Sequence, residues 1–430
     1  MRLNRTNKKL ILPTPTKQIL LPTQARNVAS KPALNGLAVV KSRGGVNIPL
    51  WSRWTNAGMM STFTTIDAGV GGTSGAFAIG EPRKQAVEIS PGKVVCAYRT
   101  ADASSNCYIV CINLNTGSVG TPVNIGHTNA RFQVVACGTD AFVIAGDDGT
   151  GSGIALKAGT VSGTTITLGT FNTIPVINTG GRYDIVAYSA TQILCVLYDQ
   201  TGPQWSVRLA TRSGTTITYE ALTATGILAS ANTPVSIGVF GTRVCVVASK
   251  ADHTIHVATA TISGNSVGAF SAFTQIYASG STISIPPEFG VNTGDGRLLI
   301  AWREATPAHL MACIDFTGTP VMGAAAVLNV GTVARIYPIT LSPLGATSGG
   351  LATMGATGIT ASCGFSVSGT TISVSPQVDI SAKIPGLTAF RSNGASCGAT
   401  VNGQPRIFYS FSEDITGVPY PLRYSLITAP

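Results

Sequence analysis

The sequence predicts an all-β fold: a seven-bladed β-propeller of four-stranded blades that carries an extended N-terminal arm. Three observations predict it. Short apolar runs recur in groups of four roughly every 50 residues, Gly-centred turns separate them, and no long stretch has the periodicity of a helix. Of the 430 residues, 44% are hydrophobic and only 11% are charged, which excludes a broadly disordered chain.

The repeat unit is clearest in the middle of the chain. Four apolar runs fill residues 132–168, and four more fill residues 183–219. The turn between the third and fourth runs recurs as Ser-Gly-Thr-Thr at 162–165, 213–216 and 368–371. Because Gly adopts a positive φ without steric cost, this turn between alternating runs predicts a tight β-hairpin.

The number of units follows from the starts of their second runs. These lie near Lys93, Ala141, Gln192, Arg243, Arg297, Gly350 and Arg406. Seven groups of four short strands favour a propeller over a sandwich, in which strands do not recur in fours.

The two ends of the repeat region complement each other. The last unit has runs at 395–401, 406–411 and 422–427 but no fourth run, whereas the strand-like segment 61–67 precedes the first complete unit. Pairing this segment with the last blade closes the ring and removes the open sheet edge. The alternative is an ordinary extra strand of the arm. We therefore expect an arm at 1–60 and a propeller at 61–430.

Residues 1–60 differ in charge from the rest of the chain. They contain no acidic residue and ten basic ones: Arg2, Arg5, Lys8, Lys9, Lys17, Arg26, Lys31, Lys41, Arg43 and Arg53. The remaining 18 basic side chains are balanced by the 18 acidic ones. Prolines every few residues, within a repeated Leu-Pro-Thr sequence, favour an extended backbone. The chain is thus predicted to be a neutral body with a basic arm.

The arm has no core of its own, so we expect it to lie against other subunits of an assembly. The expected contact residues are Arg2, Arg5, Lys8, Lys9, Ile11, Leu12, Lys17, Ile19, Leu20, Leu21 and Arg26. The alternatives are the arm's own propeller and nucleic acid. No aromatic residue precedes Trp51 in the arm, which argues against nucleic acid.

The nine cysteines are odd in number, and most lie inside apolar strand-like runs. We interpret them as small buried thiols, which fits synthesis in a reducing cytoplasm. No run approaches the roughly 18 apolar residues of a membrane helix, so no membrane insertion is expected.

The sequence contains no recognisable catalytic, metal-binding or nucleotide-binding motif. The four histidines show no metal-binding spacing, and no nucleophile elbow, phosphate-binding loop or dinucleotide fingerprint occurs. The Asp-box turns that mark sialidase propellers are also absent. We therefore expect no enzyme, no catalytic residues, no metal and no cofactor.

One charged pattern stands out. Loops on one predicted face carry acidic residues, and five of the connections that cross between blades carry an arginine before the innermost strand. The candidate binding face consists of Arg83, Arg131, Arg182, Arg335, Arg391, Asp147, Asp148, Asp199, Asp252 and Glu304. These side chains either tie blades together or form a ring that binds a sugar, an anion or a partner loop. The opposite face, built of hairpins, is expected to be small and uncharged.

The Pro/Thr-rich basic arm, together with low-charge repeats and Ser-Gly-Thr-Thr hairpins, resembles bacteriophage virion proteins, particularly tail, fibre and baseplate-associated propellers. The resemblance implies a non-enzymatic structural protein, made in the host cytoplasm and present in several copies in the virion. It further implies that residues 1–60 bind other virion proteins while the propeller serves subunit contacts or attachment to a host-surface glycan or protein. The alternative is a free lectin-like or glycan-processing, sialidase-like bacterial propeller.

Overall fold

The computed structural model divides the chain into two compact units, Met1–Arg53 with Pro430 and Trp54–Ala429. In the first it describes only short strands. In the second it describes residues 64–67, 84–100, 106–126, 132–147, 153–174, 183–199, 202–228, 235–250, 254–278, 283–285, 291–304, 309–328, 340–344, 350–356, 359–376, 378–379, 390–413 and 421–428.

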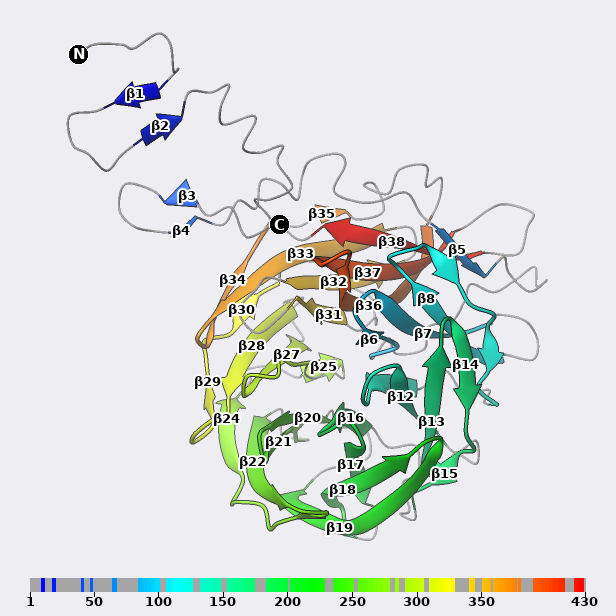
Figure 1. Cartoon of the computed structure of the whole chain (residues 1–430). Helices are drawn as coiled ribbons and strands as arrows, with labels where there is room; N and C mark the ends of the chain where they lie inside the picture. The colour runs from blue at the N-terminus through cyan, green and yellow to red at the C-terminus, as the bar shows by residue number, and fades with distance from the viewer. Residues whose placement is uncertain are drawn as a thin grey trace. The chain divides into compact units, whose positions relative to one another are not determined.

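Within its described residues, the larger unit contains seven antiparallel sheets of four to six strands and no helix (Figure 1). The first sheet holds β6 (Ala86–Ser90), β7 (Lys93–Arg99), β8 (Cys107–Asn113), β9 (Ser118–Val119) and β10 (Val123–Asn124). The second holds β11 (Phe132–Ala136), β12 (Ala141–Asp147), β13 (Ile154–Ser162), β14 (Thr165–Leu168) and β15 (Asn172–Thr173). The third holds β16 (Tyr183–Ala187), β17 (Gln192–Asp199), β18 (Gln204–Ser213) and β19 (Thr216–Leu228).

The remaining sheets repeat this order. The fourth holds β20 (Val235–Phe240), β21 (Arg243–Ser249), β22 (Thr254–Ser263), β23 (Ser266–Val267) and β24 (Thr274–Ala278). The fifth holds β25 (Ile283–Ile285), β26 (Val291–Asn292), β27 (Arg297–Glu304), β28 (His309–Asp315), β29 (Val321–Met322) and β30 (Ala326–Val327). The sixth holds β31 (Thr340–Pro343), β32 (Gly350–Ala356), β33 (Ile359–Ser368), β34 (Thr371–Val374) and β35 (Val378–Asp379).

The seventh sheet joins the two ends of the larger unit. It contains β36 (Phe390–Val401), β37 (Gln404–Glu413), β38 (Leu422–Thr428) and β5 (Thr64–Asp67). β5 pairs antiparallel with β38, with Asp67 opposite Leu422 and Thr64 opposite Tyr424. The outer edge of β38 is therefore covered by a strand from the other end of the sequence.

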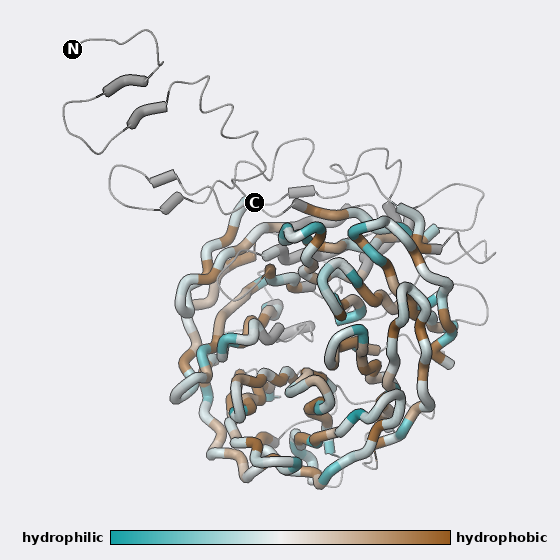
Figure 2. Tube along the Cα trace, viewed as in Figure 1, coloured by the Kyte–Doolittle hydropathy of each residue, from teal (hydrophilic) through white to brown (hydrophobic). Residues whose placement is uncertain are grey.

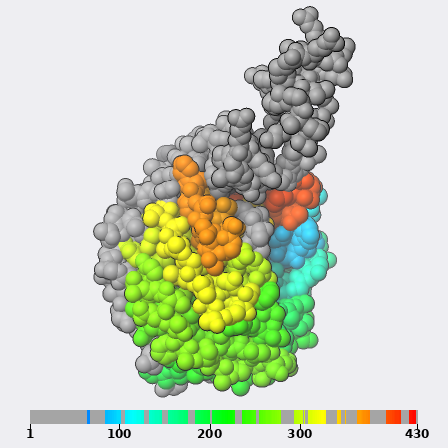
Figure 3. All heavy atoms as spheres, turned by 90° about the vertical axis from the view of Figure 1, so that its left-hand side faces the viewer, coloured from blue at the N-terminus to red at the C-terminus, as the bar shows by residue number. Residues whose placement is uncertain are grey.

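The sheets surround a common centre, with β6, β16, β20 and β31 innermost and β14, β19 and β24 outermost (Figure 1). Figure 3 shows the outer surface on the side of β24, β29 and β34. In each sheet, the turn between the first and second strands lies at the same end as the turn between the third and fourth. We call this end the hairpin edge. The opposite end, where the second strand connects to the third, is the crossing-loop edge.

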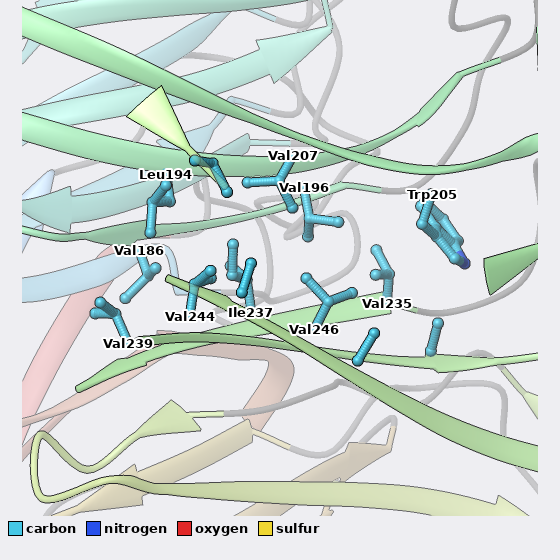
Figure 4. Packing of buried hydrophobic residues seen from close by; sticks show 14 of the residues in the cluster. Val186, Leu194, Val196, Trp205, Val207, Val235, Ile237, Val239, Val244 and Val246 are labelled. Carbon is cyan, nitrogen blue, oxygen red and sulfur yellow. The ribbon is translucent and has the colours of Figure 1, made fainter. Parts of the chain in front are cut away.

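Apolar cores fill the spaces between neighbouring sheets. Side chains alternate along a strand, so Val94 and Cys96 of β7 face the seventh sheet while Val95 and Ala97 face the second. A strand that is buried on both faces is rich in apolar residues on both sides, and Figure 2 shows hydrophobic segments in brown along the inner strands. Figure 4 shows the core between the third and fourth sheets, where Leu194 and Val196 meet Ile237 and Val246.

The predicted all-β propeller is confirmed. The cysteines are free thiols; eight are buried and Cys397 is partly exposed. Burial raises the pKa of Cys96 to about 12 and that of Cys107 to about 11, so these thiols stay neutral. In the described part of the chain, no helix has the length and apolar character needed to cross a membrane.

The first unit contains two short antiparallel ladders. β1 (Lys9–Ile11) pairs with β2 (Gln18–Leu20), with Lys9 opposite Leu20, and β3 (Val40–Lys41) pairs with β4 (Asn47–Ile48). The repeated Ile/Leu-rich sequences of this unit therefore pair with each other. Of the expected contact residues, Lys9, Ile11, Ile19 and Leu20 lie in these strands, and the others lie outside the described residues.

Candidate functional site

The outer strand of the fourth sheet contains a register shift that determines which way its aromatic side chains face. β24 pairs with β22 so that Tyr277 lies opposite Ile255 and Gln275 lies opposite His256. Ile276 is therefore an extra residue, a β-bulge. Without it, Phe273 and Tyr277 would face the same side of the sheet, because they are four residues apart. The bulge places them on opposite sides.

Tyr277 faces the fifth sheet. Its ring meets Trp302 of β27 edge to face, with centroids 5.0 Å apart, and its hydroxyl donates a hydrogen bond of 2.6 Å to Oε1 of Glu304. Burial is the largest cause that raises the pKa of Tyr277 to about 12, and the hydrogen bond to Glu304 and its charge add to it. Tyr277 is therefore a neutral donor to a carboxylate near neutral pH.

Trp302 packs against the Tyr277 ring from the core between the two sheets. Its side chain is fully buried within the core between the fourth and fifth sheets, whereas Tyr277 and Glu304 are partly exposed. Glu304 is the last residue of β27, and Tyr277 is the last but one of β24, so both lie at the crossing-loop edge. A fixed aromatic ring with a hydroxyl–carboxylate pair at its rim can bind a ligand rich in hydroxyl groups.

Phe273 faces the third sheet instead. The His256 ring lies edge to face with it at 5.3 Å, and the Lys250 ammonium lies 5.6 Å from its centroid. The His256 Nε2 is 2.7 Å from the Thr254 hydroxyl. Phe273 is 40% exposed, whereas His256 is buried. Lys250 and Thr254 lie at the crossing-loop edge, because Lys250 follows β21 and Thr254 begins β22, whereas Phe273 comes directly before β24, at the end of that strand away from this edge.

A second group of polar residues lies on the innermost strands. Gln133 Nε2 donates to the Tyr183 carbonyl at 2.9 Å, and Asp184 Oδ2 accepts from the Ser236 hydroxyl at 2.8 Å. The hydroxyls of Ser342 and Ser396 are 2.6 Å apart. Each contact runs from one sheet to the next. These buried side chains therefore join the inner strands of neighbouring sheets.

The sequence contains a signal for this group that the analysis above missed. A polar residue occupies the second position of three successive inner runs: Gln133 in Phe-Gln-Val, Asp184 in Tyr-Asp-Ile and Ser236 in Val-Ser-Ile. No comparable signal marks Tyr277, because its direction depends on the bulge.

The predicted charged face is described only in part. Asp199 and Glu304 end β17 and β27 at the crossing-loop edge, and both are partly exposed. Asp147 and Arg391 lie in β12 and β36, but their side chains are outside the description. Arg83, Arg131, Arg182, Arg335, Asp148 and Asp252 lie outside the described residues. The arginine ring stays a prediction.

The hairpin edge carries charged residues, although the sequence analysis expected it to be uncharged. Lys93 forms an ion pair of 3.0 Å with Asp140, and Arg297 forms one of 3.3 Å with Asp295. Lys93 and Asp140 belong to the first and second sheets, so the pair links their first hairpins. The expectation failed because it considered the outer Ser-Gly-Thr-Thr turns and not the inner ones. Among the residues that the structure describes, no group of His, Cys, Asp and Glu is arranged to hold a metal ion.

No protein-family model and no curated protein sequence matches the chain. Solved structures do resemble it. The polysaccharide lyase Uly1 is 11% identical, with a TM-score of 0.45 over 86% of this chain and 98% of that one. A PL25 ulvan lyase is 11% identical, with a TM-score of 0.49 over 84% and 95%. The NanB sialidase from Streptococcus pneumoniae is 10% identical, with a TM-score of 0.44 over 86% and 71%.

These comparisons contradict two predictions. The three structures named above are two polysaccharide lyases and a sialidase, not virion proteins, so the prediction of a non-enzymatic virion structural protein is contradicted. The prediction that the chain is not an enzyme is contradicted by the same finding, because the lyases and the sialidase are enzymes. At such low identity the likeness concerns the fold and transfers no ligand to this chain. The composition of the repeats misled the prediction because propellers of many functions share it.

Proposed function

We propose that this chain is a glycan-binding β-propeller and that a sugar unit binds at the crossing-loop edge between the fourth and fifth sheets. The observation that carries the proposal is the hydrogen-bonded pair of Tyr277 and Glu304, held against the buried Trp302. This arrangement gives a ligand one aromatic surface and two polar groups in a fixed geometry.

The pair suits a sugar for a chemical reason. A sugar hydroxyl donates one hydrogen bond and accepts others, and its ring carries apolar C–H faces. A carboxylate such as that of Glu304 accepts hydrogen bonds from hydroxyl groups, and the Tyr277 hydroxyl oxygen has a lone pair beside its donated bond. The partly exposed Tyr277 ring offers the apolar surface.

A second candidate is processing of the bound glycan, which the Tyr277–Glu304 hydrogen bond favours. General acid–base catalysis moves a proton between a side chain and the reacting group of the substrate, and a phenol that donates to a carboxylate at 2.6 Å can pass its own proton to that base as it does so. Turnover of a polysaccharide by the wild type that is lost in Glu304→Gln, even at glycan concentrations that saturate the variant, would identify this second function.

We also infer that each of the seven sheets is one blade and that β5 completes the seventh. Residues 1–60 then form a separate segment that binds an acidic partner surface. Its ten basic residues and lack of acidic ones support this role.

The test of the main proposal is binding to an array of glycans. We expect the wild-type chain to bind a subset of the array, and Tyr277→Phe and Glu304→Gln to weaken that binding about tenfold each. Tyr277→Phe removes the donor of the hydrogen bond, and Glu304→Gln replaces its charged acceptor with a neutral one. Tyr108→Phe, at the same edge of the first sheet, and Asp315→Asn, at the hairpin edge, are matched controls. Binding that is unaffected by both test variants, or absent altogether, refutes the proposal.

A further inference from the structure

Lys157 of β13 is buried, and no carboxylate in the described part of the chain pairs with it. It lies opposite Ile144 of β12 and therefore faces the core between the first and second sheets. Its Nζ donates a hydrogen bond of 2.7 Å to the Ile125 carbonyl and lies 4.4 Å from the centroid of the Phe171 ring. Lysines are almost never fully buried unless they are paired, so this environment is unusual.

Two other lysines of the chain provide the comparison. Lys84 pairs with Asp184 at 2.6 Å, and Lys93 pairs with Asp140 at 3.0 Å. An ion pair favours the ammonium form, which has no lone pair for a reaction. Burial acts in the opposite direction, because it lowers the pKa of Lys157. Lys157 therefore has the environment of a nucleophilic lysine, whereas Lys84 and Lys93 do not.

The backbone of Gly126 adjoins the Lys157 amine at the surface. Gly126 is exposed, has a φ of +80° and follows Ile125, whose carbonyl accepts the hydrogen bond from Lys157. A Cβ added to Gly126 would lie 3.8 Å from Nζ. Apart from the chain neighbours of Gly126, no other described residue comes within 4 Å of that point. The missing side chain therefore leaves Nζ an approach for a small molecule.

The contacts of Nζ suit the product that an amine forms with an aldehyde. The nitrogen lone pair forms a bond to the carbonyl carbon, and the carbonyl oxygen leaves as water with both amine hydrogens. The resulting imine takes up one proton and becomes a cation with a single N–H. That N–H keeps a hydrogen bond to the Ile125 carbonyl, and the charge keeps its contact with the Phe171 ring. An acylated lysine would lose that charge.

We propose that Lys157 is a covalent binding site for a small aldehyde, which forms an imine with Nζ at the surface beside Gly126. The open-chain form of a short sugar and a simple alkanal present the same reactive carbon, so either is a source of the aldehyde. The site belongs to the second sheet and is separate from the Tyr277–Glu304 pair. Neither proposal depends on the other.

The experiment traps the imine in the full-length chain near neutral pH. Glyceraldehyde represents the sugar source and propanal the alkanal source, and cyanoborohydride reduces each imine to a stable secondary amine. Peptide mass spectrometry measures the labelling rates of Lys157, Lys84 and Lys93. The side chains of Lys84 and Lys93 are 18% and 22% exposed, whereas Lys157 as a whole is 9% exposed. Exposure alone would therefore favour the two reference lysines.

Two glycine variants test the approach to the amine. Gly126→Ala places a methyl group against Nζ and should slow the labelling of Lys157 several-fold. Gly117→Ala is the matched control, because its φ is +75° and no described residue beyond its chain neighbours lies within 4 Å of the added Cβ. It imposes similar backbone strain without reaching the lysine. Phe171→Leu should also slow the labelling, because the protonated imine loses its aromatic contact.

We expect at least one aldehyde to label Lys157 several-fold faster than Lys84 and Lys93, and the faster aldehyde identifies the source. Labelling of Lys157 that is no faster than that of the two reference lysines overturns the proposal. A rate that Gly126→Ala leaves unchanged, or that Gly117→Ala lowers equally, overturns it as well, since the aldehyde then does not approach beside Gly126.

Discussion

The Lys84 ammonium donates a 2.6 Å hydrogen bond to Asp184 Oδ1, although 100 residues separate them; Lys84 lies just before β6 of the first sheet, and Asp184 lies in β16 of the third. The other carboxylate oxygen of Asp184 accepts from the Ser236 hydroxyl at 2.8 Å and from the Ile237 amide at 3.0 Å, both in the fourth sheet. Lys84 Nζ also donates to the Ile185 carbonyl. One buried carboxylate therefore joins three sheets at the centre of the propeller.

Asp184→Ala should destabilise the propeller strongly. The change leaves the Lys84 ammonium, the Ser236 hydroxyl and the Ile237 amide without their acceptor in a buried environment, at a cost of about 3 kcal/mol. Urea unfolding measures the loss. The comparison is Asp140→Ala, which removes an ion pair with Lys93 at the more exposed hairpin edge and should cost about 1 kcal/mol or less. Equal losses in the two variants would contradict the special role of Asp184.

The stability contribution of Asp140 should depend on pH. A hydrogen bond from Ser90, and then one from Lys93 with its charge, hold the pKa of Asp140 below its ordinary value. A carboxyl whose pKa is lower in the folded state stabilises the fold above the unfolded-state pKa, and this contribution is lost as the pH falls through the folded pKa. Wild type should therefore exceed Asp140→Asn in stability at pH 6, and the difference should disappear in acid. Asn tolerates the positive φ of this position, so the comparison isolates the charge.

The Tyr277 hydroxyl should ionise only in strong base. Its pKa is about 12, and the charge and hydrogen bond of Glu304 contribute to the shift together with burial. A difference titration of ultraviolet absorbance between wild type and Tyr277→Phe isolates this phenol from the other tyrosines. In Glu304→Gln the midpoint should fall but remain above the ordinary value, because burial persists. An unchanged midpoint in Glu304→Gln would show that the two groups do not interact in solution.

Removal of β5 should destabilise the propeller, whereas removal of the residues before it should not. Ile66 of β5 is buried in the core between the seventh and first sheets, and the strand covers the edge of β38. A chain that begins at residue 68 should therefore lose about 3 kcal/mol of its free energy of unfolding, because apolar burial and hydrogen bonds are lost. A chain that begins at residue 61, and so keeps β5, is the control. Thermal unfolding of the two truncated chains distinguishes a closing strand from a strand that merely lies nearby.

Much of the fold was predictable because its signals are local. A Gly-centred turn such as 213–216 and the apolar run of β21 each determine a short element without reference to distant residues. The functional group around Tyr277 was not predictable. The bulge at Ile276 carries no Gly or Pro to mark it, and Trp302 and Glu304 meet Tyr277 only because the fourth and fifth sheets pack together. Glu304 was selected from its loop position alone, and its tyrosine partner was missed.

The bulge itself gives the most specific prediction. Deletion of Ile276 removes the extra residue and leaves Gln275 opposite His256 and Tyr277 opposite Ile255, so Tyr277 still faces the fifth sheet. The Tyr277–Glu304 hydrogen bond should therefore survive, and the inner strands of the fourth sheet should keep their pairing. We expect the deletion variant to show the circular dichroism of a folded β protein and to bind glycan within about twofold of the wild type, whereas Tyr277→Phe loses binding. If the deletion variant is folded but binds as weakly as Tyr277→Phe, the extra residue itself positions the hydroxyl and the strand pairing alone does not.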